Sequence, residues 1–327
     1  MTEPTQKSQA TLQLVQSITS HAGQWCRLRF KVLKSWCLEH RPAIQAQIHQ
    51  YILLTRLDKP IGTFLLLWPT LWALWIAAEG LPSFHLLLVF TLGTLLTRSA
   101  GCVMNDYADR DFDRFVERTR SRPLTTGAVS TREAICLALG LVLIAFLLVL
   151  TTNKLTIMLS FFAIPLAVIY PYMKRYTYLP QFFLGLAFSW GIPMAFAAQT
   201  GEIARIAWLL FIANLLWTVV FDTIYAMVDR EFDLKQGMKS TAILFDDADR
   251  LIIGFLQGLV ILVLGIVGNQ LELGWLFNFS LVIGAGVFVY HQYLIRDRLP
   301  EKCFEAFLKN NWFGACIFVG IVLSYLK

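Results

Sequence analysis

Two clusters of carboxylates, each placed directly after a long apolar run, are the residues of this sequence best suited to chemistry. The first reads NDYADRDFD from Asn105, and the second reads DREFD from Asp229. They share the pattern D-R-[D/E]-F-D, 120 residues apart, which makes them a short internal repeat. Carboxylates at the ends of apolar helices are energetically costly and usually functional. The repeat therefore predicts an active or binding site built from both clusters.

Helical spacing predicts which of these side chains act together, because residues four apart share one face of a helix. Each cluster then carries one polar stripe: Asn105, Asp109 and Asp113 in the first, and Asp222, Asp229 and Asp233 in the second. Asp111 and Glu231 fall two residues off the stripes and should point elsewhere. Two facing stripes of carboxylates repel each other unless cations lie between them.

Hard oxygen ligands that are partly hydrated select Mg²⁺ over zinc or copper. Mg²⁺ held by few carboxylates completes its shell with waters and substrate phosphates, which implies a phosphate ester, most simply a diphosphate. We therefore expect Mg²⁺ as the cofactor. The predicted metal ligands are Asn105, Asp109, Asp113, Asp229 and Asp233, and the four aspartates among them are the predicted catalytic residues.

Several cations lie where they could bind such a substrate. Arg98 stands inside an apolar run and should reach the acidic cluster or a phosphate, although it could also extend to the cytoplasmic interface. Lys174 and Arg175 could grip a diphosphate or simply fix the topology, and Arg56 could bind an acidic small substrate or anchor the first helix. The predicted substrate-binding residues are Arg56, Arg98, Asn105, Lys174, Arg175 and Asp222.

The composition says which elements must position these residues. The chain has 327 residues, of which 57% are hydrophobic and only 15% are charged. A soluble domain carries about 25% charged residues, so this chain has too few to cover a soluble surface. A soluble enzyme, a disordered protein and a nucleic-acid binder are therefore excluded. The net charge of +6 is explained by cations between apolar runs, where they determine membrane topology.

Membrane-spanning helices need about 20 mostly apolar residues. Nine stretches qualify, and they predict an all-α polytopic membrane protein: 61–79, 84–104, 133–151, 155–172, 180–198, 207–226, 250–269, 273–294 and 311–326. A cytoplasmic N-terminus places 24 of the 28 Lys and Arg residues on the inner side, which supports that orientation strongly. The odd number of helices then places the C-terminus outside, in the periplasm of a bacterial inner membrane.

The first 50 residues are predicted to be a cytoplasmic or interfacial extension, and residues 51–327 the transmembrane domain. The stretch from Trp25 to Trp36 mixes cations with large apolar residues, so it could form a helix lying on an anionic membrane surface. It could equally be a cytoplasmic extension without a catalytic role.

From Arg56 to Gly314 the sequence resembles the UbiA-type intramembrane aromatic prenyltransferases. The resemblance is carried by RLDKPIGTFLLLWPTLWAL from Arg56, GCVMNDYADRDFDRFVERTRSRPLTTGAV from Gly101, YPYMKRYTYLPQFFLGLAFSWGIPMAF from Tyr170, FDTIYAMVDREFDLKQGMKSTAILF from Phe221 and NNWFGA from Asn310. The two aspartate motifs alone indicate only the superfamily. The segments RLDKPIG, MKRYT and KSTAILF favour its hydroxybenzoate branch.

The resemblance implies a bundle of nine transmembrane helices around a central cavity that opens to lipid and to the cytoplasmic face. It further implies that the aspartates hold Mg²⁺ and a polyprenyl diphosphate, with Arg175 as a diphosphate or substrate contact. The implied reaction transfers the polyprenyl group to the ring carbon of 4-hydroxybenzoate meta to its carboxylate. The products are 3-polyprenyl-4-hydroxybenzoate and diphosphate, in ubiquinone biosynthesis.

Two alternatives remain. The protein could be a related prenyltransferase that acts on another aromatic acceptor, such as homogentisate or a naphthoate. A transporter or Mg²⁺ channel with acidic gates would need polar residues along a path across the membrane, whereas the charges here crowd the inner face. The length of the native prenyl chain, the group that accepts the ring proton and the oligomeric state stay open.

Overall fold

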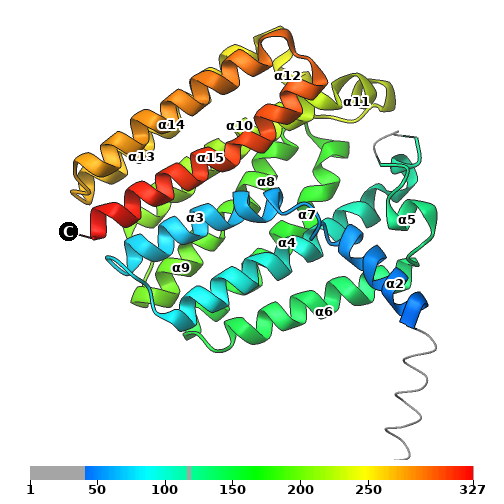
Figure 1. Cartoon of the computed structure of the whole chain (residues 1–327), viewed down its shortest axis with the longest axis horizontal. Coiled ribbons are helices and arrows are strands. Elements are labelled where there is room, and N and C mark those ends of the chain that lie inside the picture. Colours follow the sequence, from blue (N-terminus) through cyan, green and yellow to red (C-terminus); the bar gives the residue numbers. More distant parts are fainter. Residues whose placement is uncertain (1–40, 116–118, 327) are drawn as a thin grey trace, which may run out of the picture. The chain divides into compact units, whose positions relative to one another are not determined.

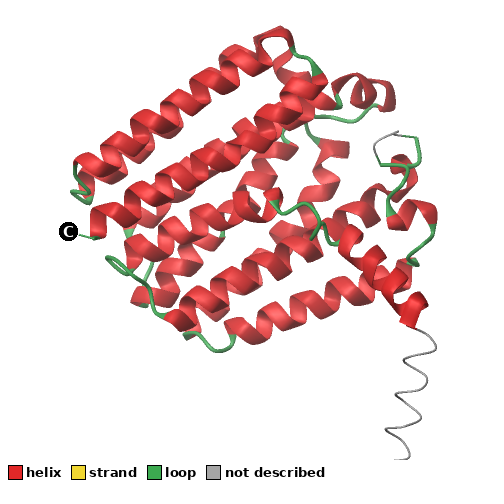
Figure 2. Ribbon diagram, viewed as in Figure 1, coloured by secondary structure: helices red, strands yellow, loops and turns green. Residues whose placement is uncertain are grey.

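The computed structural model describes residues 41–115 and 119–326. The chain divides into two units, Met1–Tyr51 and Ile52–Lys327. Within the described residues all regular structure is helical, as Figure 2 shows. α2 (Arg41–Leu54) crosses the boundary between the units. The helix predicted from Trp25 to Trp36 lies outside the described residues, and the role of residues 1–50 stays a prediction.

The second unit consists of long apolar helices joined by short turns and a few polar segments (Figure 1). The long helices are α3 (Ile61–Ala77), α4 (Phe84–Asp113), α6 (Thr131–Val149), α7 (Lys154–Tyr176), α8 (Pro180–Ser189), α9 (Gly191–Thr200), α10 (Arg205–Val228), α13 (Asp249–Gln270), α14 (Trp275–Leu294) and α15 (Pro300–Tyr325). Short helices between them are α5 (Pro123–Thr126), α11 (Arg230–Gln236) and α12 (Thr241–Phe245), with 3-10 turns at Asp246–Ala248 and Ile295–Asp297.

Eight segments of the described chain are long and apolar enough to cross a membrane, and the shorter α3 is a ninth apolar segment. α8 and α9 together form one of the eight, and α12 joins α13 in another. The predicted all-helical membrane fold is confirmed.

The helices of the second unit pack in a closed order. α3 contacts α4, α4 contacts α6 and α7, α7 contacts α8, and α8 contacts α10. From there α10, α13, α14 and α15 follow one another, and α15 returns to α3 (Figure 1). α10 is the most central span, with 61% of its apolar window buried, whereas α6 has only 17% buried and presents its leucines outward. The central helix therefore carries the second acidic motif at its end.

Aromatic side chains fill the space between α3, α10 and α15. Trp72, Trp217 and Phe313 are completely buried; the two tryptophans stack, and the Phe313 ring packs against both at a steeper angle. Both indole N–H groups find acceptors on α15, because Trp72 donates to the Gly314 carbonyl at 3.0 Å and Trp217 to the Asn310 amide oxygen at 3.0 Å. These bonds satisfy polar groups that would be costly to leave unpaired in an apolar interior.

Two helices extend well beyond their predicted apolar spans. α4 continues past residue 104 to Asp113, so the acidic motif lies on its last turns, as its helical spacing predicts. α15 begins at Pro300 rather than at residue 311. Its first three turns bury Cys303 and Ala306, while Glu305 pairs with Lys302 and Lys309 on the other side at 2.9 and 2.7 Å. A search of the sequence for continuous apolar stretches misses such amphipathic turns.

The predicted cavity that opens to lipid stays a prediction. One apolar hollow of about 230 Å³ lies between α3 and α4 and is lined by Leu57, Pro60, Thr63, Phe64, Leu67, Thr91, Leu92 and Leu95.

Gly314 provides a test of the aromatic core. A Cβ there would lie 2.5 Å from Trp68 Cδ1 and 2.8 Å from Trp217 Cη2, whereas nothing lies within 4 Å of a Cβ at Gly286. Gly314→Ala should lower the free energy of unfolding by about 1–3 kcal/mol because the tryptophans must move. Gly286→Ala, the matched control inside α14, should not lower it and should raise it by up to about 1 kcal/mol, because alanine is the better helix former. Thermal unfolding of both variants in detergent checks this, and equal stabilities would contradict it.

Candidate active site

The first acidic cluster lies on the last three turns of α4. Asp109 and Asp113 are buried, Asn105 is partly buried and Asp111 is exposed, as the helical spacing predicts. The side-chain oxygens of Asn105, Asp109 and Asp113 on α4 thus lie toward the protein interior, whereas the Asp111 carboxylate lies outside.

Asp106 is the most deeply buried carboxylate of this cluster, with 1% exposed. Arg56 binds both of its oxygens, at 2.7 and 3.0 Å, and Arg122 approaches Oδ1 at 3.0 Å. Arg56 adopts a left-handed backbone (φ 58°) and also donates to the Leu53 carbonyl at 2.9 Å, which holds its guanidinium in place. Arg56 was a predicted site residue, but Asp106 was not. The only sign of Asp106 in the sequence was a charged residue that lies off the predicted polar stripe.

Arg122 joins two carboxylates, because it also binds Asp113 at 2.7 Å. Burial raises the pKa of Asp113, an effect that the guanidinium of Arg122 opposes. Burial would lower the pKa of Arg122, but Asp106 and Asp113 beside it raise it overall. The Thr119 hydroxyl donates to the Asp113 carbonyl at 2.9 Å and so fixes the chain just beyond α4. Arg122, which was not among the predicted site residues, is a central cation of this cluster.

The last turn of α7 brings two more cations to α4. Lys174 Nζ lies 2.5 Å from Asp109 Oδ2, and Arg175 donates to the Ala108 carbonyl at 2.5 Å. The other oxygen of Asp109, Oδ1, is buried and has no hydrogen-bond partner within the described part of the chain. One oxygen of this buried carboxylate is therefore paired with a cation, and the other has no partner among the described residues.

The second cluster lies where α10 meets α11. The prediction of one continuous helix through Asp229 was wrong, since α10 ends at Val228 and Asp229 caps the junction in a non-helical conformation (φ −104°, ψ 8°). The backbone N–H of Asp233 still donates to the Asp229 carbonyl at 2.9 Å, so the two residues stay one turn apart. Both are partly buried and both have interaction partners, whereas Glu231 is exposed.

The two clusters are linked through the end of α7. The backbone N–H of Lys239, just after α11, donates to the Lys174 carbonyl at 2.9 Å, and its side chain donates to the Tyr176 carbonyl at 3.1 Å. Since Lys174 also contacts Asp109, the segment after the second cluster and the first cluster share one anchor. Both clusters therefore belong to the same end of the bundle.

Arg98 lies deeper in the bundle, on α4. Its Nη1 donates to the sulfur of Cys102, and its guanidinium packs against Gly62, where a Cβ would lie 2.5 Å from Nη2. It is within electrostatic reach of Asp222 and of two tyrosines, Tyr170 and Tyr225. Its Nε is buried and has no partner among the residues that the structure describes. Asp222 is thus close enough to Arg98 for their charges to interact, and its place on the Asp229 stripe stays a prediction.

Metal ligands are not assembled into one set. Within residues 41–115 and 119–326, no three His, Cys, Asp or Glu side chains lie close enough together to hold a metal ion. The structure brings Asp109 and Asp113 together with Lys174 and Arg122, and it connects Asp229 and Asp233 to them through backbone contacts.

Comparisons with known proteins agree with this arrangement. The model of the UbiA prenyltransferase family matches residues 66–317, which is most of the chain. The chain belongs to the UbiA prenyltransferase family. A 4-hydroxybenzoate octaprenyltransferase from Marinobacter nauticus is 58% identical over 282 residues, covering 86% of this chain and 96% of the relative. A protein of the same name from Aeromonas hydrophila is 60% identical over 276 residues, covering 84% and 96%.

Solved structures of UbiA homologues have the same fold. The apo structure of a homologue from Aeropyrum pernix K1 superposes with a TM-score of 0.71 at 25% identity, covering 80% of this chain and 98% of that one. A homologue from Archaeoglobus fulgidus, solved with GPP and Mg²⁺ bound, gives a TM-score of 0.64 at 17% identity, covering 83% and 99%. The family resemblance read from the sequence motifs is confirmed.

Arg122 tests the ion pairs that hold the first cluster together. Arg122→Gln should lower the free energy of unfolding by about 3 kcal/mol, because it leaves buried Asp106 and Asp113 short of a partner. Arg114→Gln is the matched control, since it breaks an exposed pair with Asp111 and should cost less than about 1 kcal/mol. Unfolding in detergent measures both, and equal losses would show that the Arg122 pairs contribute no more than surface pairs.

Proposed function

We propose that this protein transfers a polyprenyl group from polyprenyl diphosphate to 4-hydroxybenzoate. The relatives with this function in their names match nearly their whole lengths at 58–60% identity. The observation that carries the proposal is Asp109, which has one buried oxygen on Lys174 and the other without a hydrogen-bond partner among the described residues. Ionisable side chains at such positions in membrane proteins commonly mark sites for a substrate or an ion.

The resident ion that fits this donor set is Mg²⁺. The donors are carboxylate and amide oxygens, which hard cations prefer, and Asp109 Oδ1 offers a free lone pair. We assign the ligands to Asn105, Asp109, Asp113, Asp229 and Asp233, shared between protein and diphosphate. The fold neighbour from Archaeoglobus fulgidus, with GPP and Mg²⁺ bound, supports this assignment. When bound, the ion would neutralise negative charge on the leaving diphosphate.

Lys174 and Arg175 are then the diphosphate cations. Lys174 pairs with Asp109 in the protein as described, and a ligand on Asp109 releases its ammonium group to bind a phosphate oxygen. Arg175 lies beside it at the α4 backbone. Both would stabilise charge on the leaving group as the allylic C–O bond breaks. Arg56 has its guanidinium on buried Asp106, so we assign it a structural role rather than substrate binding.

The acceptor site follows from the polar groups inside the bundle. Arg98 has an Nε without a partner in the described part of the chain, and it lies close to Asp222, Tyr170 and Tyr225. These groups suit a small molecule with a carboxylate and a phenol. The ring carbon ortho to the hydroxyl attacks the allylic carbon, and that ring position then loses its proton. The apolar walls exclude water, which would otherwise quench the allylic cation.

The orientation in the membrane belongs to the same proposal. The chain is a multi-pass membrane protein with bacterial relatives. We propose a cytoplasmic N-terminus, a periplasmic C-terminus and an active site at the cytoplasmic face. The distribution of Lys and Arg in the sequence supports this orientation.

Substitution of the two clusters tests the proposal. Asp109→Asn and Asp229→Asn should each lower prenyl transfer by about 100-fold or more, because each removes a carboxylate that would hold the Mg²⁺ needed to neutralise the leaving diphosphate. Asp111→Asn and Glu231→Gln are the matched controls, since both side chains are exposed, and they should keep near wild-type rates. Transfer of labelled octaprenyl diphosphate in membranes measures all four. Full activity of either Asp109→Asn or Asp229→Asn would contradict the proposal that both clusters form the site.

Acceptor choice is tested with the wild-type protein. Membranes supplied with a labelled prenyl diphosphate should prenylate 4-hydroxybenzoate in preference to homogentisate or a naphthoate, and product masses identify the acceptor. Preference for homogentisate or a naphthoate would reassign the protein within its family. The tail length of the host's quinones shows which prenyl chain is native.

A further inference from the structure

α11 is the least supported helix near the second cluster. It has seven residues, Arg230–Gln236, and none of them is buried. A helix this short is not stable by itself in water, so its position must come from contacts with its surroundings. Because α11 begins directly after Asp229 and carries Asp233, whatever holds α11 also holds both carboxylates of the second cluster.

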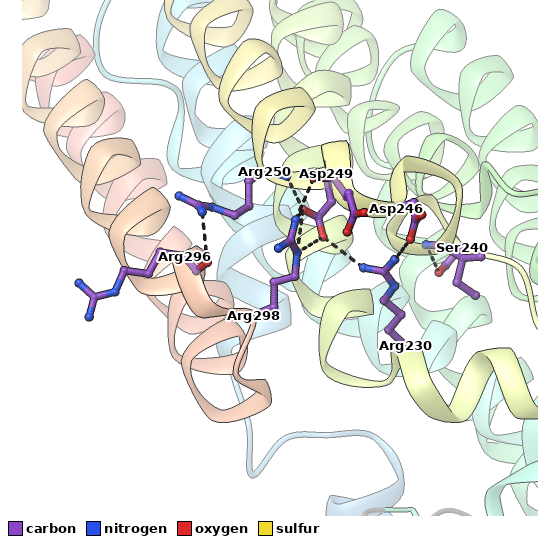
Figure 3. Close-up of polar contacts among 9 residues, drawn as sticks. Arg230, Ser240, Asp246, Asp249, Arg250, Arg296 and Arg298 are labelled. Atoms are coloured by element: carbon purple, nitrogen blue, oxygen red, sulfur yellow. Dashed lines mark hydrogen bonds and ion pairs between the residues drawn. The ribbon is translucent and has the colours of Figure 1, made fainter.

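The contacts that hold α11 are polar and lie at its two ends. At its C-terminal end the N–H of Met238 returns to the Asp233 carbonyl at 2.9 Å, and Lys239 binds the end of α7. At its N-terminal end the side chain of Arg230 reaches two carboxylates outside the helix. It donates to Asp246 and lies 3.4 Å from Asp249 Oδ2, as Figure 3 shows.

The two ion pairs of Arg230 differ in how much they contribute to stability. The Asp246 side chain is 73% exposed, so its pair with Arg230 contributes little. Asp249, the first residue of α13, is completely buried. Arg298 binds both of its oxygens, at 2.8 to 3.1 Å, and the backbone N–H of Arg250 donates to Oδ1 at 2.6 Å.

Arg298 is itself fixed in place. It lies just before α15 in a left-handed backbone conformation (φ 53°), and its Nη2 also donates to the Asp247 carbonyl at 2.8 Å. Asp249 thus forms a rigid anionic point between the start of α13 and the start of α15, and Arg230 is the side chain that connects it to the second cluster (Figure 3).

We propose that Asp249 is a positioning residue of the prenyl-transfer site, which holds Asp229 and Asp233 in place through Arg230. The inference rests on the proposed function and assigns Asp249 no contact with substrate. Some residues contact a metal ligand without binding the metal themselves, and their substitution commonly changes metal affinity about 10- to 100-fold. Asp249 would have a comparable effect through its salt bridge to Arg230, although it lies on a different helix.

Two variants and two controls test the proposal. Arg230→Gln cuts the connection while leaving Asp249 paired with Arg298, and Asp249→Asn removes the charge itself. Asp246→Asn removes only the exposed partner, and Asp297→Asn breaks an exposed pair with Arg296 far from Arg230 in the chain. The first readout is the Mg²⁺ concentration that half-saturates prenyl transfer. The second is Mg²⁺-dependent thermal stabilisation of the purified protein by geranyl diphosphate, which reports binding without turnover.

Arg230→Gln and Asp249→Asn should each raise the half-saturating Mg²⁺ concentration about tenfold and weaken the thermal stabilisation in parallel. Both controls should stay within about twofold of wild type. Combining Arg230→Gln with Asp249→Asn should add little to either single effect, because both break the same connection.

A purely structural Asp249 would lower the melting temperature and leave both Mg²⁺ readouts at wild-type values, and that result would overturn the proposal. If Asp249→Asn does not fold, Arg230→Gln alone decides, since it preserves the buried pair. Wild-type protein that neither transfers a prenyl group nor binds geranyl diphosphate with Mg²⁺ would refute the proposed function instead. The two failures are therefore distinguishable.

Discussion

Burial of three carboxylates at the end of α4 is the constraint on which the rest of the site depends. Asp106, Asp109 and Asp113 are each no more than 6% exposed, and an unpaired charge in such surroundings is strongly destabilising. Their partners come from three separate segments of the chain: Arg56 before α3, Arg122 after α4 and Lys174 at the end of α7. The buried acidic motif is therefore stable only where these segments meet. The same ion pairs that compensate its negative charge also bring together the segments of the candidate active site.

The pairs are not equivalent. Arg56 and Arg122 share Asp106, which leaves that carboxylate fully committed. Asp109 is different, because the cation paired with it is a lysine and its second oxygen has no partner in the described structure. A lysine is a mobile point charge, whereas a bidentate arginine is fixed by its geometry. In the proposed function, Asp106 therefore holds the fold, whereas Asp109 exchanges its partner for a metal ion and a diphosphate.

The sequence was sufficient to predict the membrane fold, both acidic motifs and the family. Apolar runs, a repeated D-R-[D/E]-F-D pattern and the distribution of cations are local signals that need no knowledge of contacts. The exposed positions of Asp111 and Glu231 also followed from helical periodicity alone.

Contacts between distant segments could not be predicted in this way. Nothing near Asp106 in the sequence indicates that Arg56, 50 residues earlier, binds it. The break at Asp229 was missed because a four-residue spacing persists across it through the bond from Asp233. Asp249 stood out even less, since its partners lie 19 and 49 residues away and its burial depends on the packing of α13 and α15.

The central claim is that both acidic clusters hold one Mg²⁺–diphosphate group. Equilibrium binding of labelled geranyl diphosphate to purified protein, with and without Mg²⁺, tests it directly in a double-mutant cycle of Asp109→Asn and Asp229→Asn. If the site is shared, wild-type binding needs Mg²⁺, each substitution removes most of the Mg²⁺-dependent affinity, and the double variant loses little more. Binding that is independent of Mg²⁺, or losses that simply add, would contradict a shared site.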